Sequence, residues 1–159
     1  MYNAGMEKNV KRVYVDNSVI SGMFDTNDHP QRATPFWTAV KKGTVQIIVS
    51  DVLEREVERA PQHVRDFYRT IPESQIERIE STAASDALAE RYIAEGIVTK
   101  NSLNDSLHVA LASVARADVL VSFNCTHIVT LDRIRQYNAI NMLLGYPPIE
   151  IRTPDEVIQ

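Results

Sequence analysis

Short apolar runs alternate along the chain with longer stretches in which apolar residues recur at helical spacing. The short runs predict strands over residues 12–16, 45–50, 75–80, 118–123 and 149–151. The longer stretches predict helices over residues 19–24, 34–42, 51–59, 61–68, 82–95, 103–114 and 131–144. Strands that alternate with helices predict an α/β fold, with a central, mostly parallel sheet covered by helices on both faces.

The predicted helix over residues 103–114 carries two stripes. Its core-facing band consists of apolar residues at helical spacing, namely Leu103, Leu107, Ala110, Leu111 and Val114. A polar stripe runs beside it and fades into small residues; it contains Asn101, Asn104, Asp105 and His108, followed by Ala112 and Ala115. A solvated face would keep long charged residues, so this stripe is interpreted as the wall of a cleft.

Polar residues stand at two strand ends and at one helix start. Asp16 ends the first strand, Asn124 lies just past the fourth, and Asp105 begins the helix that leads into the fourth. Ligands of parallel sheets bind beyond the carboxyl ends of the strands, so we expect these residues to meet there. Clustered carboxylates repel one another unless they hold a cation, and oxygen ligands favour Mg²⁺ or Mn²⁺. Such a site is typical of metal-assisted phosphodiester hydrolysis.

Composition describes the setting of this site. A chain of 159 residues is expected to form a single domain over residues 12–159, after an irregular segment over residues 1–11. The net charge of −4 argues against broad nonspecific binding of nucleic acid, and the single cysteine, Cys125, excludes an intrachain disulfide. No apolar run approaches membrane-spanning length and no signal-peptide pattern opens the chain, so a cytoplasmic protein without membrane contact is expected.

Four segments, taken in order, carry a resemblance to a known family. They are Val13–Ile20, Ser50–Val57, Asn104–His108 with the strand and turn over Val119–Ile128, and the tail from Asp132 to Pro154. Together they resemble the PIN-domain family, and within it the VapC-like ribonuclease toxins. The resemblance covers the chain from about Arg12 onward and implies a three-layer α/β/α PIN-like fold.

The resemblance also implies roles for residues at matching positions. Three acids fall on the family's metal-binding positions, namely Asp16, Glu56 and Asp105, and Asn124 falls on a fourth catalytic position that is often Asp in the family. Residues that help to orient the first acid or a phosphate fall on Asn17 and Ser18. Further candidates for substrate-binding or supporting roles are Asn104, His108 and His127.

Plainer interpretations of these residues stay open. Asp16 is also suited to cap the following helix. Glu56 also fits a solvated face of paired charges, with Glu54 as its rival for the metal position. His108 also fits a structural histidine, and His127 a residue that fixes the turn after the strand.

The predicted function is a metal-dependent endoribonuclease, a VapC-like toxin of a type II toxin–antitoxin system with Mg²⁺ or Mn²⁺ as cofactor. The resemblance implies RNA as substrate, a homodimer, and a cognate antitoxin as partner. Asn124 brings no charge to a position that is often acidic in the family. The alternative is therefore a PIN-like binding or regulatory module without catalysis.

Overall fold

Five parallel strands form the centre of the computed structural model, which describes residues 11–158. The strands are β1 (Lys11–Val15), β2 (Val45–Ser50), β3 (Ile76–Ile79), β4 (Val119–Val121) and β5 (Glu150–Arg152). Their order across the sheet is β3-β2-β1-β4-β5, and every neighbouring pair is parallel. The sheet predicted to be mostly parallel is thus entirely parallel.

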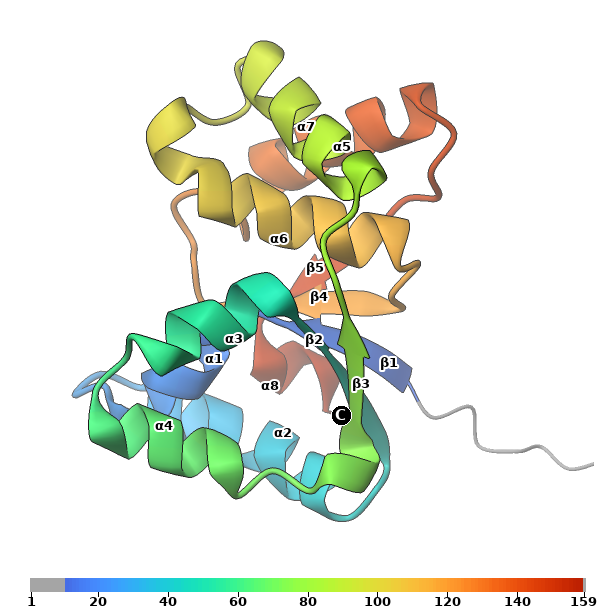
Figure 1. Cartoon of the computed structure of the whole chain (residues 1–159). Helices are drawn as coiled ribbons and strands as arrows, with labels where there is room; N and C mark the ends of the chain where they lie inside the picture. The colour runs from blue at the N-terminus through green and yellow to red at the C-terminus, as the bar shows by residue number, and fades with distance from the viewer. Residues whose placement is uncertain (1–10, 159) are drawn as a thin grey trace, which may run out of the picture.

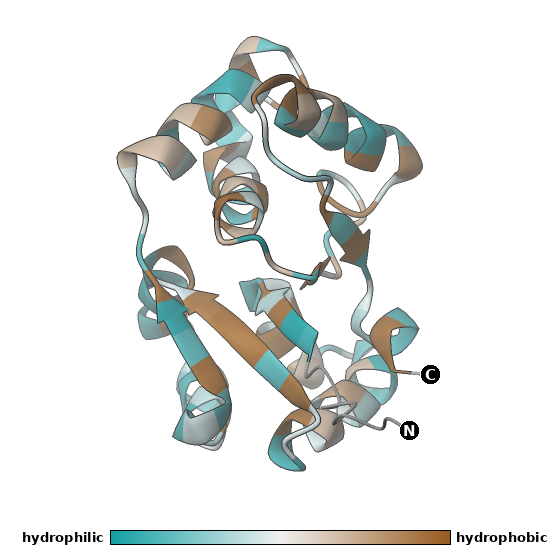
Figure 2. Ribbon diagram, turned by 90° about the vertical axis from the view of Figure 1, so that its right-hand side faces the viewer, coloured by the Kyte–Doolittle hydropathy of each residue, from teal (hydrophilic) through white to brown (hydrophobic). Residues whose placement is uncertain are grey.

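One face of the sheet is covered by helices from the first half of the chain and by the last helix. They are α1 (Asn17–Ser21), the 3₁₀ turn η1 (Gly22–Phe24), α2 (His29–Lys41), α4 (Gln62–Arg69) and α8 (Pro154–Val157). Their apolar side chains share one core with the side chains of alternate strand positions such as Val13, Val15 and Ile47. Four of the six residues of β2 are apolar, and the strand is mostly brown in Figure 2.

The other face is covered by α5 (Ala83–Ala94), the 3₁₀ turn η3 (Lys100–Ser102), α6 (Leu103–Val114) and α7 (Leu131–Leu143). These helices lie above the strands in Figure 1 and form a second core around Tyr14, Ile48 and Leu120. α3 (Asp51–Glu58) contributes to both cores, since Val52 belongs to the second and Leu53 to the first. The three-layer α/β/α architecture is confirmed.

The helix after the first loop begins earlier than predicted. α2 starts at His29 rather than at Thr34, and Pro35 lies inside it. Pro30 stands in the first turn, where a backbone N–H has no helical partner, and this favours the earlier start. Pro35 costs a hydrogen bond further along, yet the helix continues because Phe36, Trp37 and Val40 are buried against the sheet.

The stripes of α6 differ in part from the prediction. Leu103, assigned to the core band, is 42% exposed, whereas His108, assigned to the polar stripe, is only 2% exposed. α6 packs against α5 on one side and against α3 and β4 on others, so its buried arc is wider than a single apolar stripe. The buried residues include Ser106 and Ser113, whose hydroxyls donate to carbonyls of the helix itself.

The predicted irregular segment over residues 1–11 lies outside the described residues except for Lys11, which begins β1. The single-domain assignment for residues 12–159 stays a prediction. Among residues 11–158, no helix combines the length and apolar character needed to cross a membrane.

Candidate active site

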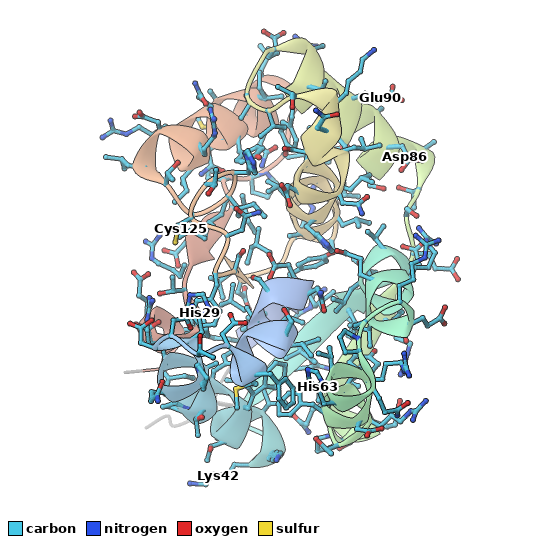
Figure 3. The ribbon with its side chains drawn as sticks, turned by 90° about the vertical axis from the view of Figure 1, so that its left-hand side faces the viewer. His29, Lys42, His63, Asp86, Glu90 and Cys125 are labelled. Carbon is cyan, nitrogen blue, oxygen red and sulfur yellow. The ribbon has the colours of Figure 1, made fainter. Side chains whose placement is uncertain are left out.

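A cleft of about 230 Å³ opens where the carboxyl ends of the strands meet the first turns of the helices. Figure 3 views this side of the molecule, with Cys125 on the loop after β4 and His63 on α4. The cleft is lined by Asp16, Asn17, Ser18, Ser21, Glu56, Asp105, His108 and Asn124. The structure therefore brings together all four predicted catalytic residues, which come from the position after β1, from α3, from α6 and from the loop after β4.

Asp16 follows β1 directly and is both a helix cap and part of the cleft. Its Oδ1 accepts hydrogen bonds from the backbone N–H and the hydroxyl of Ser18, at 3.0 and 2.5 Å. Its Oδ2 accepts a hydrogen bond of 2.5 Å from Ser122, the residue after β4. Burial raises the pKa of Asp16, while the nearby His108 and the two serine hydroxyls oppose that rise. The carboxylate is thus held rigidly between two neighbouring strands.

Glu56 is held by a chain of hydrogen bonds that starts in the core. Its Oε1 lies 2.5 Å from Nε2 of His108, and Nδ1 of His108 lies 2.7 Å from the hydroxyl of Tyr14. The Tyr14 hydroxyl also lies 2.7 Å from Oγ of Ser50, which accepts the backbone N–H of Leu53 and so caps α3. These contacts hold the imidazole of His108 in one orientation, with its Nε2 directed at Glu56.

His108 lies among the three acids of the cleft. Its burial works to lower its pKa, but the hydrogen bond and charge of Glu56, with the charges of Asp16 and Asp105, outweigh burial and raise it. His108 can therefore be a buried structural residue and at the same time orient the carboxylate of Glu56.

Asp105 and Asn124 form the opposite side of the cleft. Burial raises the pKa of Asp105, and this rise is opposed by His127, by a hydrogen bond with the Asn124 side chain, and by His108. Oδ1 of Asn124 accepts the backbone N–H groups of Thr126 and His127, at 3.3 and 3.0 Å. Because this oxygen holds the turn, the amide N–H₂ is the part of Asn124 that can donate to Asp105.

Three candidates lie outside the cleft lining. Asn104 is exposed on the first turn of α6. His127 follows Asn124 in the loop after β4, and its charge acts to lower the pKa of Asp105. Glu54, the rival of Glu56, instead accepts a hydrogen bond from Tyr68 and pairs with Arg78 on another surface.

Sequence reasoning missed the residues that support the acids. Ser122 was not among the candidates, and Tyr14 and Ser50 were assigned to strands and to the segments that resemble the family, without a supporting role. Ser21, which lines the cleft, was not a candidate either. Ser50 carried a detectable signal, because a serine just before a helix is a typical N-cap. Tyr14 carried none, because a buried aromatic residue in a strand is ordinary core.

The donors in the cleft fit a hard divalent cation. Carboxylate oxygens are the ligands that Mg²⁺ and Mn²⁺ prefer. Oδ1 of Asp16 already accepts two hydrogen bonds, whereas Oδ2 accepts one and keeps a lone pair. Burial raises the pKa values of Asp16 and Asp105, so a cation would offset the cost of their charges. Within residues 11–158, no three acidic, histidine or cysteine side chains already form a complete metal-binding group. The fit therefore rests on donor chemistry and burial.

Two solved structures share this architecture. VapC20 of Mycobacterium tuberculosis, a sarcin–ricin loop cleaving toxin, superposes with a TM-score of 0.56 at 11% identity over 86% of this chain and 98% of its own. VapBC2 of Rickettsia felis, bound to a DNA fragment from its promoter, gives a TM-score of 0.55 at 14% identity over 89% and 98%. The chain has a VapC-like PIN fold.

The VapC-like fold is recognised from the structure and not from whole-sequence similarity. No family model matches the sequence, and no curated protein matches it. At identities of 11% and 14%, the likeness to the two solved structures establishes the fold alone.

Proposed function

We propose that the chain is a metal-dependent endoribonuclease, a VapC-like toxin of a type II toxin–antitoxin system. The observation that carries this proposal is the meeting of Asp16, Glu56 and Asp105 in one cleft at the carboxyl ends of the strands. The VapC-like fold supports it, since VapC20 is a toxin that cleaves the sarcin–ricin loop.

Asp16, Glu56 and Asp105 would hold Mg²⁺ or Mn²⁺. When bound, such a cation supplies an activated water and neutralises charge that develops on the phosphate. Asp16 is fixed by Ser18 and Ser122, and Glu56 is fixed by His108. These bonds lower the cost of ordering the ligands when a cation binds.

Asn124 acts in this proposal as a positioning residue for Asp105. Its oxygen fixes the loop after β4, and its amide stabilises the charged form of Asp105. Asn17 and Ser18 line the same cleft and supply polar groups for the RNA backbone.

The proposal includes RNA as substrate, a cytoplasmic setting, a homodimer and a cognate antitoxin. The antitoxin is supported by the likeness to VapBC2, which was solved with DNA from its promoter.

A binding module without catalysis is the second candidate. It is favoured by Asn124, which brings no charge and whose oxygen is engaged by the turn. Such a module would bind RNA or a protein partner through the same face and would cleave nothing.

RNA cleavage by acid variants tests the proposed function. The wild type is expected to cleave single-stranded RNA or a sarcin–ricin loop hairpin in Mg²⁺ or Mn²⁺, and not in EDTA. Asp16→Asn and Asp105→Asn are expected to slow cleavage by about a hundredfold or more, because each removes a metal-binding charge. Cleavage is followed by gel electrophoresis, with folding checked by circular dichroism.

Asp86→Asn is the matched control for these variants. Asp86 is exposed on α5, away from the cleft, and undergoes the same change of charge. Cleavage at the wild-type rate by both cleft variants would contradict the site. Absence of cleavage by the wild type in either metal would favour the binding module.

A further inference from the structure

Buried polar side-chain atoms without a hydrogen-bond partner are few in the described part of the chain. They are Oδ1 of Asn17, Nδ1 of His127 and Nε of Arg133. Folded proteins pair nearly all such atoms, so each one calls for an explanation. Asn17 lines the acid cleft, and His127 is bonded through its backbone N–H to Asn124 of that cleft.

Tyr137 connects Arg133 to the same region. The Tyr137 hydroxyl donates a hydrogen bond of 2.9 Å to the backbone oxygen of His127. Arg133 precedes Tyr137 by four residues on α7, so the two side chains share one helix face. Burial raises the pKa of Tyr137, and the charges of Asp105 and Arg133 act on it in opposite directions. The Tyr137 hydroxyl is therefore bonded to a residue of the loop that contains Asn124, and the charges of Asp105 and Arg133 both act on it.

The chemistry of Arg133 indicates an anionic ligand. Its side chain makes no hydrogen bond or ion pair with any residue over 11–158, although its Nε is buried. A guanidinium is always charged and carries five donors in a planar fork, which matches the oxygens of a phosphate. An anion beside the acids is disfavoured unless it is part of a larger ligand that makes other contacts, and an RNA strand across the cleft is such a ligand.

We propose that Arg133 binds a phosphate of the RNA strand next to the scissile bond. The inference rests on the proposed function, because that function places RNA in the cleft. It assigns Arg133 a direct contact with the substrate, at a position outside the four predicted catalytic residues.

Arg135 provides a matched control on the same helix. It is exposed, two residues from Arg133, and makes no ion pair among the described residues. Binding of a fluorescent single-stranded RNA is measured by anisotropy in EDTA, over a range of salt concentrations. Arg133→Gln is expected to weaken binding about tenfold and to reduce the slope of log K against log salt by about 0.7, the effect of one lost phosphate contact. Arg135→Gln is expected to change both quantities much less.

Arg133→Lys keeps the charge and tests the fork geometry if Arg133→Gln fails to fold. It is expected to weaken binding less than Arg133→Gln, and to reduce the salt slope little. Equal weakening by Arg133→Gln and Arg135→Gln would overturn the inference, as would binding by Arg133→Lys and Arg133→Gln at wild-type strength.

Inorganic phosphate distinguishes a strand phosphate from a free one. Thermal stabilisation of the wild type by millimolar phosphate, lost in Arg133→Gln while RNA binding is unchanged, would assign the site to free phosphate and overturn the inference. If RNA binding depends on Arg133 but no RNA is cleaved, the proposed nuclease function is contradicted and the contact between Arg133 and the phosphate is still supported. Cleavage that depends on Asp16, with RNA binding indifferent to Arg133, would overturn this contact alone.

Discussion

Tyr14 connects the hydrophobic core to the cleft through a single hydroxyl. Its side chain is fully buried, and its oxygen lies 2.7 Å from both Ser50 and His108. Burial raises the pKa of Tyr14 well above its ordinary value, so the group stays a neutral phenol. The hydroxyl therefore supports the N-cap of α3 and the imidazole that holds Glu56.

Tyr14→Phe is expected to reduce both stability and activity. Removal of the hydroxyl leaves Nδ1 of His108 without a partner and removes one of the two hydrogen bonds of Oγ of Ser50, at a cost of about 1–3 kcal/mol in the free energy of unfolding. Cleavage is expected to fall as well, because Glu56 loses its fixed orientation. The measurements are urea unfolding and the RNA cleavage rate.

Tyr92→Phe is the matched control for Tyr14→Phe. Tyr92 is equally buried, and its hydroxyl donates to Asn141 in the same core but away from the cleft. It is expected to lose stability without a loss of cleavage by the folded protein. If the two variants cleave RNA equally well, the chain from Tyr14 to Glu56 has no role in activity.

Single residues were predictable where they broke a local pattern. Asp16 ends an apolar strand and Asp105 interrupts a core helix, so both were identified as candidates from position and chemistry. Glu56 stands among other charged residues and was selected by the family resemblance. The buried state of His108 could not be predicted, because it depends on how α3 and α6 pack together.

At the scale of elements, the N-terminus of α3 is tied to the segment after β3. Asp51, in the first turn of α3, accepts hydrogen bonds from the backbone N–H and the hydroxyl of Ser81, at 3.0 and 2.6 Å. Partial burial works to raise the pKa of Asp51, but the bonds from Ser81 and Val52 and the charge of Arg55 outweigh burial and lower it. The charged form of Asp51 is therefore favoured by the folded state.

The contribution of Asp51 to stability is expected to depend on pH. A carboxyl group whose pKa is lower in the folded state stabilises the protein above its unfolded pKa and loses that effect as pH falls through the folded pKa. Asp51→Asn is thus expected to lower the free energy of unfolding near pH 7, with a difference that shrinks below about pH 4. Urea unfolding across this range measures the difference.

Ser81→Ala serves as the partner in a double-mutant cycle with Asp51→Asn. Because the two side chains share a hydrogen bond, their effects are expected to be less than additive. Additive effects would contradict the proposed link between Asp51 and Ser81. A destabilisation by Asp51→Asn that grows as pH falls below about 4 would contradict it as well.

Most element bounds were predictable because apolar periodicity determines them. The strand over 45–50 was predicted at its observed bounds, and the helices over 82–95 and 131–144 within a residue or so of theirs. The start of α2 was predicted at Thr34 instead of His29, because a proline inside a helical pattern usually marks a helix boundary. The short helix α8 was missed because four residues do not establish a period.

At the scale of the whole molecule, the strand order places the acids together. β1 lies at the centre of the sheet between β2 and β4, so the residues that follow these three strands meet at one end. α6 crosses above the sheet and brings Asp105 to that end (Figure 1). The alternation of strands and helices predicted the fold class, but the order of the strands came from the structure alone, because periodicity carries no information on pairing.

The central claim is that Asp16, Glu56 and Asp105 bind one divalent cation. Thermal unfolding of the wild type and of Asp105→Asn during a titration with Mn²⁺ tests it most directly, because a ligand of the folded state raises the melting temperature. At a Mn²⁺ concentration about a hundredfold above the dissociation constant, the wild type is expected to gain about 2.7 kcal/mol, or roughly 5–10 °C. Asp105→Asn is expected to gain little. An equal shift in both proteins, or no shift in the wild type up to millimolar Mn²⁺, would contradict the claim.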